Sequence, residues 1–118
     1  MKSERLERGW GGHFICSDEC LFRRNTLVTN GEKRIVVSTV GLMKIGSSFE
    51  TVGCERYFET MAFEAKFDGK YWDADVSRHV DFESPWSIGI IDAENQANEM
   101  HENVVNEIML KLEQETQP

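Results

Sequence analysis

The chain has 118 residues and a formal net charge of −8, from 21 acidic and 13 basic residues. This length predicts one domain with a hydrophobic core of its own. Because nucleic-acid binders generally present a basic face to the phosphates, the charge argues against general DNA or RNA binding. A small acidic protein can instead imitate nucleic acid and occupy a basic groove on a protein partner.

The sequence predicts neither a membrane span nor a secretory signal. The first five residues include three charged side chains, and no apolar stretch approaches the roughly 20 residues of a membrane-spanning helix. Three cysteines are an odd number and do not form a closed disulfide framework. We therefore expect a cytoplasmic protein with reduced thiols and no contact with a membrane.

Residues 1–12 are predicted to form an irregular arm, because Trp10 stands among Gly9, Gly11 and Gly12. Two roles remain open for Trp10. It can anchor the arm on the core, or it can stack on a base of a bound ligand.

Residues 13–91 are predicted to form an antiparallel β-sheet built from hairpins. Asn30-Gly31 and Asp68-Gly69 are turn signals between runs rich in β-branched and aromatic residues. In the longest run, the face that carries Met61 and Phe63 is expected to form the core, with Glu59 as a polar exception. The expected strands cover residues 13–16, 21–29, 34–42, 49–52, 56–67, 71–76 and 86–91.

Residues 92–113 are predicted to form one long amphipathic helix that starts at Asp92, a residue type that favours helix N-caps. Apolar side chains recur at steps of three and four and are expected to pack on the sheet, whereas His79 and His101 are expected to be exposed. The fold class is therefore α+β, with this helix closing the sheet. The apolar stripe consists of Ala97, Met100, Val104, Ile108 and Leu112.

A metal site is one candidate constellation. His13, Cys16 and Cys20 follow an H-x2-C-x3-C spacing, and Cys54 could complete a tetrahedral set for zinc. Alternation along a strand places His13 and Cys16 on opposite faces, and buried structural cysteines are common. We therefore expect no metal and no cofactor, and these four residues remain the candidates if a metal is present.

A phosphate-binding site is the second candidate. Arg23, Arg24 and Arg56 could supply guanidinium groups, which suit phosphate oxygens. Neighbouring arginines on one strand point to opposite faces, so Arg23 and Arg24 cannot line one pocket by themselves. Each would need a second arginine from another strand. The alternative is that these arginines pair with the many carboxylates of the chain. In the ligand hypothesis, Asn25 and Thr26 orient the ligand, and Tyr57 or Trp10 stacks on its base.

Several segments resemble a family of small uncharacterised proteins encoded by bacteriophages and prophages. The segments are RGWGGHFIC at 8–16, FRRNTL at 22–27, VVSTVG at 36–41, RYFETMAF at 56–63 and NEMHE at 98–102. In size and layout the chain is also similar to phage anti-defence sponge proteins of the Thoeris type. That resemblance implies an oligomer that sequesters a nucleotide signal without cleaving it, and it implies no particular site residue.

The leading functional hypothesis is a non-enzymatic protein that binds a small phosphate-bearing ligand, such as a cyclic nucleotide or an ADP-ribose derivative, as a homo-oligomer. One alternative is an acidic inhibitor that binds a protein partner. A second alternative is a small nucleotide-processing enzyme in which Glu59 or His13 is the acid–base group, although no catalytic motif supports it.

Overall fold

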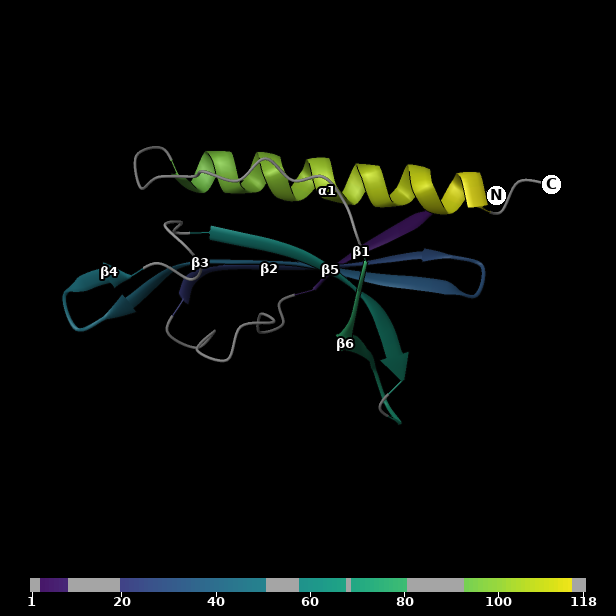
Figure 1. Ribbon diagram of the computed structural model, residues 1–118, viewed down its shortest axis with the longest axis horizontal. Coiled ribbons are helices and arrows are strands. Elements are labelled where there is room, and N and C mark those ends of the chain that lie inside the picture. The colour runs from purple at the N-terminus through teal and green to yellow at the C-terminus, as the bar shows by residue number, and fades with distance from the viewer. Residues whose placement is uncertain (1–2, 9–19, 51–57, 68, 81–92, 116–118) are drawn as a thin grey trace.

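In the computed structural model, the described residues are 3–8, 20–50, 58–67, 69–80 and 93–115. They form six strands and one helix, and the helix lies across one face of the sheet (Figure 1). The predicted α+β class is therefore confirmed. The elements are β1 (Glu4–Arg8), β2 (Cys20–Asn30), β3 (Lys33–Ile45), β4 (Ser48–Glu50), β5 (Phe58–Phe67), β6 (Trp72–Val80) and α1 (Ala93–Glu115).

The strand order is β1-β2-β3-β5-β6, with the short β4 also paired to β3, and all of these pairs are antiparallel. The prediction of an irregular arm is wrong for residues 4–8, because β1 pairs with β2 from Glu4 opposite Thr29 to Arg8 opposite Asn25. This strand is mostly charged, as edge strands often are, so it lacks the apolar alternation by which strands are recognised.

The Asn30-Gly31 hairpin is confirmed, with the turn displaced by one residue. Asn30 pairs with Lys33, so Gly31 and Glu32 form the two-residue turn. Gly31 has a φ of 62°, whereas Glu32 is not among the residues with positive φ. This is the pattern of a turn with glycine at its first central position.

The main core lies between α1 and the sheet. The predicted apolar stripe of the helix is buried in full, and Val105 and His101 are buried beside it. The helix packs on the β5 face that carries Phe58 and Ala62. The sequence favoured the opposite face, and that face is buried as well at Phe63, so apolar alternation could not indicate which one the helix covers.

The sheet is curled, so that its two edges approach each other on the face away from α1. The Arg8 side chain of β1 donates a hydrogen bond to the Trp72 carbonyl of β6. The guanidinium of Arg34 lies over the Trp72 ring, 4.3 Å from its centre. Val36 and Val40 are fully buried on this second face. From Ile35 to Leu42, β3 is therefore buried on both faces, which explains its apolar run Ile35-Val36-Val37.

Three predicted features lie outside the described residues: the strand at 13–16, the strand at 86–91 and the helix cap at Asp92. Within the described residues, no helix is both long enough and apolar enough to cross a membrane.

Candidate functional site

A buried polar cluster crosses the interface between α1 and the sheet, with His101 at its centre. The imidazole is 0% exposed. Its Nε2 lies 2.7 Å from the Thr26 hydroxyl of β2, and its Nδ1 lies 2.7 Å from the Thr39 hydroxyl of β3. The Thr39 hydroxyl is also 2.7 Å from the Thr60 hydroxyl of β5. His101 therefore bonds two adjacent strands directly and is linked to a third through the Thr39 hydroxyl.

The strand register explains why these side chains meet. Thr39 stands opposite both Arg24 of β2 and Thr60 of β5, and Thr26 stands opposite Glu7 of β1. Because alternate residues share a face, all five side chains point toward the helix. His101 follows the buried Ala97 by four residues, which places it on the same side of α1.

Ionised Glu7 fixes the direction of every hydrogen bond in this cluster. The hydroxyl of Thr26 is 2.7 Å from Oε2 of Glu7, and a carboxylate can only accept. Thr26 therefore donates to Glu7 and accepts from Nε2–H of His101. Nδ1 must then accept from Thr39, and Thr39 accepts from Thr60. Each group in the series Thr60, Thr39, His101, Thr26 and Glu7 therefore donates to the next one. His101 is the neutral tautomer that carries its proton on Nε2.

Charged side chains close the open end of this cluster. Arg24 lies 2.7 Å from Glu7 and 3.6 Å from Glu102, and Arg5 lies 2.6 Å from Glu102 and 3.3 Å from Glu7. Burial opposes ionisation of Glu7, but the hydrogen bonds from Thr26 and Arg24 outweigh it and lower the pKa of this carboxyl. Burial, aided by the positive charge of Arg24, lowers the pKa of His101 to about 4.

These properties suit docking of the helix and not catalysis at this position. His101 has no atom open to solvent, both of its nitrogens are bonded, and it is neutral at pH 7. The expectation that His101 is exposed is therefore wrong, whereas His79 is exposed as predicted. The missed signal is the spacing of four from Ala97, which places the imidazole in the buried stripe.

The predicted phosphate-binding residues divide between the two faces of β2. Arg24 and Thr26 join the cluster under α1, where Glu7 and Glu102 pair with Arg24. Arg23 and Asn25 belong to the opposite face, where Asn25 is buried and accepts a hydrogen bond of 2.8 Å from Nε of Arg8. The structure thus does not bring these four side chains together. Three further candidates, Trp10, Arg56 and Tyr57, lie outside the described residues.

The remaining candidates are the predicted metal ligands and Glu59. Cys20 is buried, and His13, Cys16 and Cys54 lie outside the described residues. Within the part of the chain that the structure describes, no three His, Cys, Asp or Glu side chains gather closely enough to hold a metal ion. Glu59 is half-buried opposite Val40, on the face away from α1. Arg24 lies on the other face of the sheet, where it pairs with Glu7 and Glu102.

Helix α1 carries much of the negative charge of the chain. The helix contains six glutamates and one lysine, a formal charge of −5. On its outer face Glu99 and Glu107 are exposed, and Leu110 is 60% exposed one turn after Glu107. The last turn contains no basic residue, although cations are the favoured charges at a helix C-terminus.

Comparison of the chain with protein-family models, with curated proteins and with solved structures finds no match. The resemblance to phage proteins therefore stays a prediction.

Proposed function

We propose that this protein is a non-enzymatic binding protein whose outer α1 face docks on a basic protein partner. The observation that carries the proposal is the exposed Leu110 set among the carboxylates of a helix with a charge of −5. Protein interfaces commonly combine an apolar anchor with a polar rim, and complementary charge steers the two partners together.

The glutamates of the helix differ in how far they are already compensated. Arg5 and Arg24 pair with Glu102, whereas Glu99 and Glu107 are exposed. Glu107 lies about one turn before Leu110, so the exposed apolar side chain has a carboxylate close to it on the helix surface.

The experiment is affinity capture from cell lysate with the purified protein and two charge-reversed variants. Glu99→Lys/Glu107→Lys changes the proposed face, and Glu4→Lys/Glu32→Lys makes the same change of net charge at exposed positions on β1 and the β2–β3 turn. We expect one or more basic proteins to bind the unmodified chain and the control, and to be lost from the helix variant.

The affinity of a captured partner tests the role of the apolar anchor. We expect Leu110→Ala to weaken binding about tenfold, which corresponds to about 1.4 kcal/mol. Binding is expected to weaken further as salt screens the carboxylates. The proposal is contradicted if the partner binds both charge-reversed variants with equal affinity, or if its affinity does not change with salt concentration.

Nucleotide binding stays a prediction beside this proposal. Nucleotide-sized ligands generally occupy hollows of roughly 300–1,000 Å³. The hollow beside the C-terminal half of α1 measures about 120 Å³, which is too small. Thermal-shift measurements with cyclic nucleotides and ADP-ribose test the prediction, because any ligand that binds the folded chain raises its melting temperature.

A further inference from the structure

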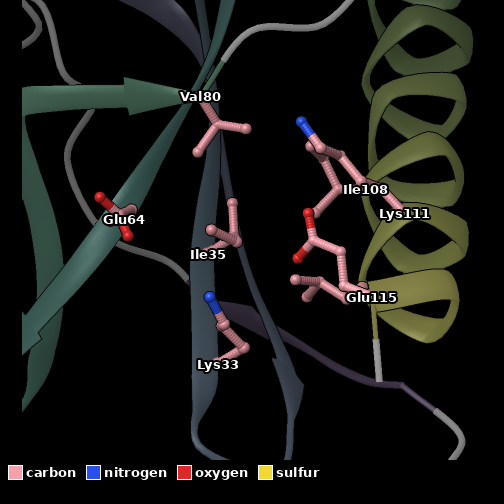
Figure 2. A pocket seen from close by; sticks show the side chains of 8 residues that line it. Lys33, Ile35, Glu64, Val80, Ile108, Lys111 and Glu115 are labelled. Carbon is pink, nitrogen blue, oxygen red and sulfur yellow. The ribbon is translucent and has the colours of Figure 1, made fainter. Parts of the chain in front are cut away.

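A small hollow lies beneath the last turns of α1, where the helix faces β3, β5 and β6 (Figure 2). Its volume is about 120 Å³. The apolar part of its lining consists of Ile35, Val80, Ile108 and Leu112. The charged part consists of Lys33 and Glu64 from the sheet, and of Lys111 and Glu115 from the helix.

The volume limits the size of a guest. A cavity of about 150 Å³ holds a benzene ring when its walls are apolar. The hollow under α1 is slightly smaller and open on one side, so it accommodates an alkyl group of about four to six carbons. Because Val80 is only partly buried, such a group would remove apolar surface from water when it binds.

The charged side chains limit the charge of a guest. Figure 2 shows the ammonium groups of Lys33 and Lys111 reaching the hollow from its two walls. Among the residues that the structure describes, neither ammonium makes an ion pair, whereas Glu64 is held by Arg78 at 2.8 Å. The lining itself holds two lysines and two glutamates, but Arg78, from outside the lining, already compensates Glu64. Glu115 is then the one uncompensated carboxylate of the described lining, against the two ammonium groups of Lys33 and Lys111.

The same balance favours one negative charge over two. Lys33 and Lys111 attract an anion, but the carboxylate of Glu115 lies on the same opening and repels it. A phosphate monoester, with about 1.5–2 negative charges at pH 7, meets this repulsion more strongly than a carboxylate does. Lysine ammonium groups bind a carboxylate as point charges and require no particular ligand geometry.

We propose that this hollow binds a short apolar carboxylate, with its alkyl group on the four apolar side chains and its charge between Lys33 and Lys111. A free aliphatic acid and a peptide with an apolar C-terminal residue share this chemistry. The site is separate from the outer α1 face that carries Leu110, so either proposal can fail without the other.

The first test is an NMR titration of the full chain with butanoate, hexanoate, octanoate and hexanamide. Each buried methylene contributes about 0.8 kcal/mol, so we expect affinity to rise about fourfold per carbon up to hexanoate and then to level off. The methyl signals of Ile35, Val80 and Ile108 are expected to shift. Hexanamide, which has no charge, is expected to bind at least tenfold more weakly, and equal binding of hexanamide overturns the proposal.

Peptides ending in leucine distinguish the two sources of the carboxylate. Binding of the free-acid peptide but not of its C-terminal amide identifies a peptide terminus as the natural guest. Binding of hexanoate without the peptide identifies a free acid. If neither produces a saturable shift of these methyl signals, the proposal is overturned.

Substitutions provide the second test. We expect Lys33→Gln/Lys111→Gln to weaken hexanoate binding at least tenfold, whereas Lys70→Gln, an exposed lysine near the β5–β6 turn, leaves it unchanged. Val80→Phe is expected to fill the hollow and abolish binding, with circular dichroism as the check on folding. If Val80→Phe does not fold, Lys33→Gln/Lys111→Gln still tests the proposal. Unchanged affinity of this double variant for hexanoate overturns it.

Discussion

Removing the Thr39 hydroxyl is the most direct test of the buried polar cluster under α1. Thr39→Val keeps the shape of the side chain but leaves two buried groups without their partners, Nδ1 of His101 and the hydroxyl of Thr60. Each unsatisfied buried group costs about 1–3 kcal/mol, and the added methyl group returns about 0.8 kcal/mol. We therefore expect Thr39→Val to lower the free energy of unfolding by about 3 kcal/mol, out of the ~5–15 kcal/mol typical of a domain.

The direction of the hydrogen bonds makes this prediction sharper. Thr60 only donates to Thr39, so Thr60→Val leaves a single acceptor unsatisfied, and we expect a loss of about 1 kcal/mol. In Thr39→Val/Thr60→Val only Nδ1 of His101 lacks a partner, so the double variant is expected to be no less stable than Thr39→Val alone.

Urea unfolding at pH 7, followed by circular dichroism, measures these differences. Thr29→Val is the matched control, because Thr29 is half-exposed on β2, and a change below about 0.5 kcal/mol is expected there. A loss of less than about 0.5 kcal/mol for Thr39→Val, or strictly additive losses in the double variant, would refute the reasoning.

Three further predictions concern the same interface. The folded-state pKa of His101, about 4, is below its ordinary 6.5, so the unfolded chain binds more protons than the folded chain between these pH values. The free energy of unfolding, measured with urea, is therefore expected to fall by about 3 kcal/mol as the pH is lowered from 6.5 to 4. The pKa of Glu7 is also lowered, from an ordinary value of 4.5, so Glu7 adds a further loss only below about pH 4.5. His101→Gln is expected to flatten the profile above that pH, whereas the exposed-residue control His79→Gln keeps it. Nitrogen NMR of the imidazole is expected to show a proton on Nε2 and none on Nδ1, and the opposite tautomer contradicts the assigned bond directions. Gly41→Ala is expected to lower the melting temperature, because a Cβ there would lie 2.2 Å from Cδ1 of Phe58, and overpacking of this kind costs at least ~1–3 kcal/mol.

Local patterns in the sequence were sufficient for much of the fold. The turn at Gly31 follows from its need for positive φ, and the buried stripe of α1 follows from apolar residues at steps of three and four. β1 was missed because its register depends on pairing with β2, and a charged edge strand has no apolar alternation of its own.

The polar cluster could not be predicted from local patterns, because its members come from four strands and one helix. Burial of Thr26 and Thr39 depends on where α1 docks, and His101 is 62 residues from Thr39 in the chain. Alternation correctly predicted that Arg23 and Arg24 face opposite ways, but it could not reveal that Glu7 approaches Arg24. Arg24 pairs with carboxylates, which is the alternative that the sequence left open.

The position of His101 also restricts how α1 can slide along the sheet. A shift of one helical turn, about 5.4 Å, would bring Ala97 or Val105 opposite the hydroxyls of Thr26 and Thr39. An apolar core alone would tolerate such a shift, because the stripe repeats at nearly the same interval. With the imidazole displaced, the two hydroxyls would face hydrocarbon, so a single histidine selects one docking register from several that are otherwise similar in apolar contact.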